Sequence, residues 1–140
     1  MSFKPAARRR AREYAVQAIY QWQMSGNPLN EIEAQYLTTM NANKVDTVYF
    51  QELFNGVLVE LEELDQLLLP ALDRDIEDID PIERAIIRIS GFELSKRVDI
   101  PKKVVINEGI ELAKTFGATD GHKFVNGVLD KISKSLRPHE

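Results

Sequence analysis

The chain has no cysteine, and it has few of the other residues from which catalytic and metal sites are commonly built. Without thiols it can form neither a disulfide framework nor a thiolate nucleophile, which fits a reducing compartment and predicts a cytoplasmic location. Its two histidines are His122 and His139, and no HExxH pair occurs, so a zinc site would depend mainly on carboxylates. These absences disfavour thiol enzymes and zinc enzymes.

Glycine and long apolar runs are also scarce. The seven glycines form no Walker A loop, GxGxxG turn or GxSxG elbow, so the sequence offers no backbone cradle for a nucleotide phosphate. No apolar run approaches the roughly 18 residues of a membrane helix. Glu13, Gln17 and Gln21 interrupt the apolar residues that follow the basic start, so we expect no secretory signal.

Acidic residues are concentrated between residues 60 and 80, where nine acids stand against one arginine. Carboxylates at near-alternate spacing could bind a metal, but an EF-hand loop needs Gly at its sixth position and Glu at its twelfth, and neither is present. We interpret the block as a solvated connection that favours solubility. His122, with no partner for a general base, is interpreted as a surface or capping residue. The carboxylates of this block at near-alternate spacing are Asp73, Asp75, Glu77, Asp78 and Asp80. From these observations we expect no enzymatic activity, bound metal or cofactor.

The apolar residues recur at three- and four-residue steps along the whole chain. A chain of 140 residues with 44% hydrophobic content can bury one sizeable core, so we expect one domain over residues 1–140. No segment alternates with a period of two, which predicts an all-α fold of about seven helices. Gly26 and Gly117 are expected to end two of these helices, and Pro70 to shorten another. The aspartates expected to cap helix N-termini are Asp46, Asp65, Asp80 and Asp120.

The N-terminal stretch KPAARRRARE carries five basic residues and one acid, although the whole chain has a net charge of −4. Charges act over a Debye length of about 8 to 10 Å, so the distant acidic block need not cancel this segment. At 100° per residue the arginines spread around more than half of a helix, which suits a phosphate chain more than one salt bridge. The segment predicts nucleic-acid binding, with a solvated tail as the alternative. Its basic residues are Lys4, Arg8, Arg9, Arg10 and Arg12.

A second region, AKTFGATDGHKFVNGVLDK, places basic and aromatic residues around a tight turn between two helices. Phe124 belongs to the apolar stripe of the last helix, so Phe116 is the better candidate for stacking on a base. Asp120 presents a conflict, because as an N-cap it stabilises the helix while its charge opposes RNA. The basic and aromatic residues are Lys114, Phe116, His122, Lys123 and Phe124.

Five segments together resemble the NusB family of bacterial transcription antitermination factors. ARRRARE leads into AVQAIYQWQ, and ERAIIRISGFELSKR, PKKVVINEGIELAKTFG and KFVNGVLDKI follow in the order and at the spacing of that family. The resemblance covers essentially the whole chain. It implies two small helical bundles, binding to boxA RNA, a heterodimer with the ribosomal protein NusE, and support of ribosomal RNA transcription in the elongation complex.

The resemblance also implies roles for particular residues. The arginine-rich motif and the turn would face RNA, whereas a separate surface on the first and central helices would face NusE. Gly121 stands where the family often has Ser, which could remove a hydroxyl contact to RNA, and Gly91 lies inside a helix, where it could permit a close helix contact. The RNA-facing residues are Lys4, Arg8, Arg9, Arg10, Arg12, Phe116, Asp120, His122, Lys123 and Phe124. The NusE-facing residues are Tyr20, Met24, Ile82 and Glu83.

Two other functions stay open at this point. A NusB-like domain can accompany an RNA methyltransferase, although we expect no room for a cofactor-binding domain in a chain that ends at Glu140. Alternatively, the chain could be a protein-interaction module whose arginines are only a solvated tail. RNA titration with and without NusE distinguishes the second possibility from RNA binding.

Overall fold

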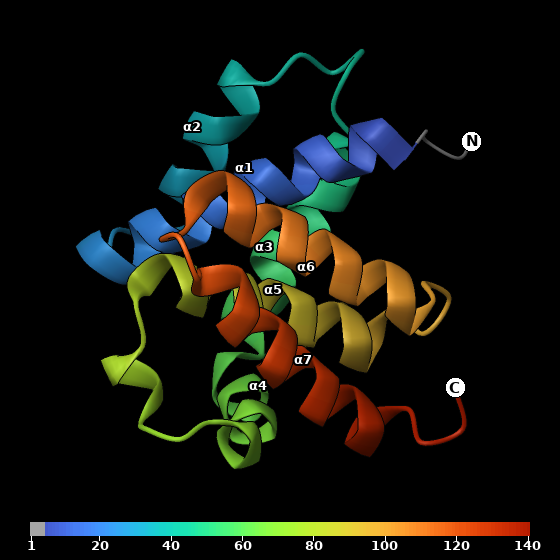
Figure 1. Ribbon diagram of the computed structural model, residues 1–140. Helices are drawn as coiled ribbons and strands as arrows, with labels where there is room; N and C mark the ends of the chain where they lie inside the picture. Colours follow the sequence, from blue (N-terminus) through green and yellow to red (C-terminus); the bar gives the residue numbers. More distant parts are fainter. Residues whose placement is uncertain (1–4) are drawn as a thin grey trace.

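The computed structural model describes residues 5–140, which form seven α-helices and two short 3-10 turns and contain no strand (Figure 1). The all-α prediction is confirmed. None of the helices in this range combines the length and apolar character that crossing a membrane requires. The helices are α1 (Pro5–Ser25), α2 (Leu29–Thr39), α3 (Thr47–Val59), α4 (Leu61–Leu68), α5 (Pro81–Lys96), α6 (Lys102–Phe116) and α7 (Gly121–Leu136), and the 3-10 turns are Leu69–Ala71 and Ile76–Asp78.

Three helix ends lie where local signals predicted them. Gly26 adopts φ 68° directly after α1, and its amide donates to the carbonyl of Trp22. Asp46 caps α3 by accepting from the Tyr49 amide at 3.0 Å. Asp80 caps α5, with Pro81 at the first helical position.

Two predicted caps differ from the structure. Asp65 lies inside α4, which begins at Leu61, and its carboxylate accepts two hydrogen bonds from Arg88 of α5 at 2.9 and 3.0 Å. Asp120 occupies the position before α7, as predicted, but its side chain makes no capping hydrogen bond and lies 3.3 Å from Lys123 Nζ instead. The carboxylate of Asp120 is thus paired with a lysine of the first turn, and that of Asp65 with an arginine of another helix.

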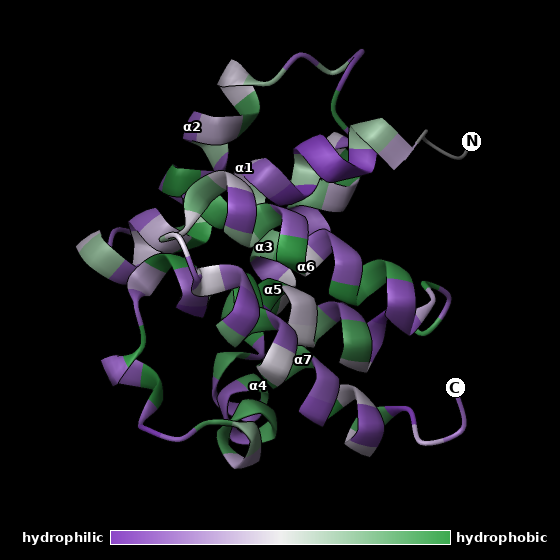
Figure 2. Ribbon diagram, in the orientation of Figure 1, coloured by the Kyte–Doolittle hydropathy of each residue, from purple (hydrophilic) through white to green (hydrophobic). Residues whose placement is uncertain are grey.

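Helix α5 lies at the centre of the fold. Helices α1–α3 form one small bundle and α4–α7 a second, and α5 packs against members of both (Figure 1). Every residue from Arg84 to Leu94 is buried, and the apolar residues of the two bundles form one continuous core. In Figure 2 apolar and polar residues alternate in bands along the helices, as expected for amphipathic helices. Gly91 permits the close approach of α4, since a Cβ there would lie 3.2 Å from Leu68.

Candidate nucleic-acid interface

Arg12 lies inside the protein, on the face of α1 that meets α5. Only 3% of Arg12 and 1% of Glu93 is exposed, and Arg12 Nη2 lies 2.8 Å from Glu93 Oε2, with Nε 3.0 Å from the same oxygen. The Tyr49 hydroxyl donates to Glu93 as well. A guanidinium held in this way is already occupied by carboxylates, which argues against the predicted contact between Arg12 and RNA. Its role is to fasten the arginine-bearing turns of α1 to the core.

Electrostatics supports this ionic core. Burial opposes ionisation of Arg12, but the charge and hydrogen bonds of Glu93 outweigh it, so the pKa of Arg12 is raised. Burial, followed by the negative charge of Glu93, raises the pKa of Tyr49 above its ordinary value of 10. The Tyr49 ring is further flanked by the guanidiniums of Arg8 at 4.4 Å and Arg97 at 5.0 Å from its centroid. Tyr49 therefore stays neutral at physiological pH and serves as a platform for arginines.

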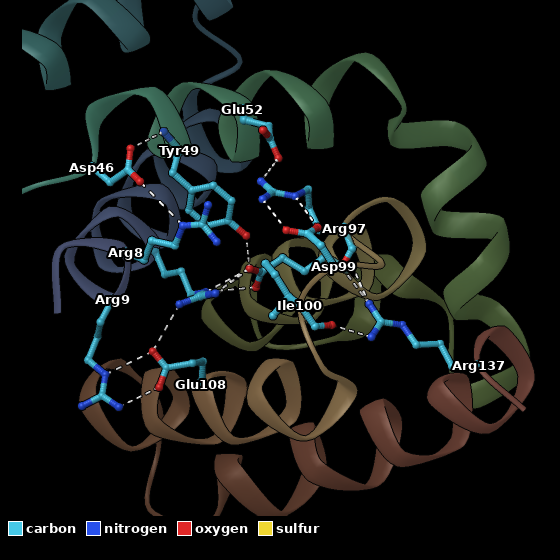
Figure 3. A network of polar contacts seen from close by, with 12 residues as sticks. Arg8, Arg9, Asp46, Tyr49, Glu52, Arg97, Asp99, Ile100, Glu108 and Arg137 are labelled. Atoms are coloured by element: carbon cyan, nitrogen blue, oxygen red, sulfur yellow. Dashed lines mark hydrogen bonds and ion pairs between the residues drawn. The ribbon is translucent and has the colours of Figure 1, made fainter. Parts of the chain in front are cut away.

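Arg9 extends outward and is paired with Glu108 of α6 (Figure 3). Its Nε lies 3.1 Å from Glu108 Oε1 and its Nη2 lies 2.6 Å from Oε2, so the pair is bidentate. The hydrogen bond to Glu108 raises the pKa of Arg9. Arg12 Nη1 also lies 3.3 Å from Glu108 Oε1. One carboxylate of α6 thus joins an inner and an outer arginine of α1.

Arg8 and Arg10 complete the exposed group at the start of α1. Arg8 Nε lies 3.6 Å from Asp46 Oδ2, and about a third of its side chain is exposed. Arg10 is exposed, and its Nη1 lies 3.4 Å from the carbonyl oxygen of Lys44. A cleft of about 900 Å³ adjoins these arginines, and its lining includes Asp99 and Val104. Lys4, the remaining basic residue of the motif, lies outside the described residues.

The second predicted region lies further along α6 and around its turn into α7. Lys114 and Lys123 are both exposed, and each pairs with one acid. The distance from Lys114 Nζ to Glu111 Oε1 is 4.0 Å, and that from Lys123 Nζ to Asp120 Oδ1 is 3.3 Å. Lys114 is six positions after Glu108, which corresponds to about 9 Å along the helix axis. Helix α6 therefore connects the two predicted regions.

The aromatic residues of this turn are less available than its lysines. Phe116, Phe124 and His122 are half-buried, and both phenylalanines pack against the core. The guanidinium of Arg74 lies 5.6 Å from the Phe124 ring centroid. The outer face of Phe124 is thus partly occupied by an arginine of the acidic segment.

The predicted partner surface is assembled from the end of α1 and the start of α5. Tyr20 and Met24 are exposed on α1 beside a hollow of about 510 Å³. The Gln23 side-chain amide donates to the carbonyl of Pro81 at 2.8 Å, which holds the two helix ends together. Ile82 and Glu83 are half-buried there, and burial raises the pKa of Glu83, with Asp80 adding to the effect. A Cβ at Gly121 would lie 2.9 Å from the carboxylate of Glu83.

The sequence reasoning missed the residues that hold the arginines in place. Glu93 stands between Phe92 and Leu94 in the most apolar helix, and an acid in that position was a usable signal of a buried pair. Glu108 lies far along the chain in an ordinary amphipathic helix, where nothing local marks it as a partner of Arg9. Within residues 5–140, no group of three metal-binding side chains lies close enough to hold an ion.

Comparisons with known proteins agree with this architecture. The model of the NusB family matches residues 9–134. The transcription antitermination protein NusB of Sodalis glossinidius is 55% identical over 136 residues, covering 97% of this chain and 98% of that protein. NusB of Yersinia enterocolitica is 58% identical over 134 residues, covering 96% and 97%.

Solved structures show the same fold. NusB of T. maritima superposes with a TM-score of 0.81 at 27% identity, covering 96% of this chain and 93% of that one. NusB in a crystal structure of the antitermination factors NusB and NusE with dsRNA gives a TM-score of 0.82 at 24% identity, covering 94% and 99%. With a family model spanning most of the chain and relatives of nearly equal length above 50% identity, this chain belongs to the NusB family.

Proposed function

We propose that the protein is a non-catalytic, cytoplasmic, RNA-binding transcription antitermination factor. It binds boxA-type RNA together with NusE and supports transcription of ribosomal RNA operons within the elongation complex. The observation that carries the proposal is the group of arginines at the start of α1, which a buried ion pair fixes: Arg9 and Arg10 are exposed, and Arg8 is partly exposed beside the Tyr49 ring. Membership in the NusB family, and a related fold solved with NusE and dsRNA, support it.

The RNA surface in this proposal runs from the three arginines along α6 to the turn before α7. It includes Lys114, Phe116, His122, Lys123 and Phe124. Lys4 lies outside the described residues and is included only as part of the basic sequence motif. Arg12 is not part of the outer surface. NusE would bind the surface that carries Tyr20, Met24, Ile82 and Glu83, where exposed apolar groups adjoin the hollow on α1 and Glu83 borders Gly121 of the RNA-facing turn.

Titration of a boxA RNA in a salt series, with and without NusE, tests this function. Each phosphate contact on single-stranded RNA contributes about −0.7 to the slope of log affinity against log salt. Replacing Arg9 and Arg10 together by alanine is expected to weaken binding and to flatten the slope by about 1.4, because two phosphate contacts are lost. Lys96→Ala is the matched control, since Lys96 is exposed at the far end of α5 and pairs with Glu60 and Glu63.

Two results would contradict the function. A slope near zero for the unmodified protein would exclude phosphate recognition. If the protein binds NusE but no RNA, and if replacing Arg9 and Arg10 leaves NusE binding unchanged, the result would instead favour a protein-interaction module.

Asp120→Asn is expected to tighten RNA binding about threefold. Asp120 is 76% exposed, makes no capping hydrogen bond and neutralises Lys123, so removing its charge frees a cation at little structural cost. Affinity measured at one fixed salt concentration checks this. Asp130→Asn, which breaks a similar exposed pair with Lys134 on the same helix, should leave affinity unchanged. Weaker or equal binding by Asp120→Asn would place the RNA path away from the turn.

A further inference from the structure

Glu108 differs from Glu111 and Asp120, two other acids near the candidate RNA surface, in how its charge is covered. Its side chain is 12% exposed, whereas Glu111 is 52% and Asp120 is 76% exposed. An exposed carboxylate repels an approaching phosphate directly. Glu108 lies instead between two guanidiniums, those of Arg9 and Arg12, which screen its charge from outside.

The geometry of the Arg9 pair leaves one edge of the guanidinium available. Glu108 takes the edge formed by Nε and Nη2, at 3.1 and 2.6 Å. A guanidinium is planar and has a second edge, formed by Nη1 and Nη2, which can bind another oxyanion in a bidentate manner. That edge faces away from Glu108, and more than half of the Arg9 side chain is exposed. A phosphate can therefore reach Arg9 without displacing Glu108.

Glu108 is itself held from the inside. Arg12 Nη1 lies 3.3 Å from Glu108 Oε1, while Nε and Nη2 of Arg12 bind Glu93 in the core. The resulting chain of charges runs from Glu93 through Arg12 and Glu108 to Arg9. Because each member is fixed by its inner neighbour, the orientation of Arg9 is set by the core of the protein.

We propose that Glu108 is a positioning residue of the RNA site, which holds Arg9 with its outer edge toward an RNA backbone phosphate. This inference rests on the proposed RNA-binding function. In the absence of Glu108, the charge of Arg9 is no longer neutralised by a partner, but its orientation is no longer fixed. RNA binding must then order a long side chain that Glu108 orders beforehand in the unmodified protein.

Glu108→Gln separates positioning from simple electrostatics. The variant is expected to bind boxA RNA about fivefold more weakly, although it is one unit less negative, because ordering one long side chain opposes binding. Glu111→Gln is the matched control on the same helix, with the same change of charge, and it should bind as tightly as the unmodified protein or more tightly. Thermal unfolding of each variant confirms that the fold is retained.

A double-variant cycle with Arg9→Ala completes the test. In the Arg9→Ala background, Glu108→Gln is expected to leave RNA affinity unchanged, because the arginine that it positions is gone. Equal or tighter binding by Glu108→Gln alone would overturn the proposal, and so would a fivefold loss that persists without Arg9. If the unmodified protein shows no salt-dependent RNA binding, the proposed function itself fails, a result distinct from either of these.

Discussion

Replacing Glu93 by glutamine is expected to lower the free energy of unfolding by about 3 kcal/mol. The substitution keeps the shape of the side chain but leaves the Arg12 guanidinium, 3% exposed, against a neutral amide. A buried charge that loses its partner cannot be rehydrated without opening the contact between α1 and α5. Glu108 offers Arg12 only one contact, at 3.3 Å, and does not replace the three hydrogen bonds to Glu93.

Urea denaturation measures this loss. Glu111→Gln, which removes an exposed acid, should change stability by less than about 0.5 kcal/mol. The double variant Arg12→Met with Glu93→Leu removes both charges and is expected to be more stable than Glu93→Gln alone, since no buried ion is left unpaired. A loss below about 1 kcal/mol for Glu93→Gln would mean that water reaches Arg12.

Arg137→Ala is expected to destabilise the protein by a similar amount, about 3 kcal/mol. Arg137 follows α7, is buried, and donates hydrogen bonds to the carbonyl oxygens of Glu93, Leu94, Arg97 and Ile100. Figure 3 shows its guanidinium beside Arg97 and Ile100. The carbonyls of Glu93 and Arg97 also accept from the backbone amides of Arg97 and Ile100, whereas those of Leu94 and Ile100 lie at and just beyond the end of α5, where helical partners run out. Without the guanidinium, the carbonyls of Leu94 and Ile100 lose the donor that Arg137 supplies.

Thermal or urea unfolding again provides the measurement. Lys134→Ala, one turn earlier on α7 and exposed, should alter stability by less than about 0.5 kcal/mol. The stability of Arg137→Lys is expected to lie between those of Arg137→Ala and Lys134→Ala. An ammonium has three donors, but it lacks the planar guanidinium that reaches carbonyls on different sides. If Arg137→Lys were as stable as the unmodified protein, the charge alone would explain the contact.

Much of the fold could be predicted from local signals. The cap at Asp80, the glycine after α1 and the three- and four-residue spacing of apolar side chains each act within a few residues, so the sequence alone displays them. Asp65 and Asp120 had the same local signature, but Arg88 and Lys123 compete for their carboxylates. Arg88 comes from another helix, and such tertiary competition is invisible to a local pattern.

The candidate site was predicted in part, for similar reasons. The concentration of arginine indicated a polyanion surface, and the exposed positions of Arg9 and Arg10 are compatible with it. The inward direction of Arg12 had a signal that was not used, because Arg12 shares the helical face of Val16 and Ile19. Glu93 of α5 and Glu108 of α6 could not be predicted as the partners of Arg12 and Arg9. A single sequence contains no signal that shows which residues far apart along the chain are in contact.

The distance along the chain between the arginines and their carboxylates has a consequence for synthesis on the ribosome. Arg12 and Glu93 are 81 residues apart, and Arg9 and Glu108 are 99 residues apart. Contacts of such long sequence separation form only after both ends have emerged, whereas local helical turns form early. A nascent chain therefore carries Arg12 unpaired until α5 has left the exit tunnel and Arg9 unpaired until α6 has left it, so the ordered surface described above is a property of the nearly finished protein.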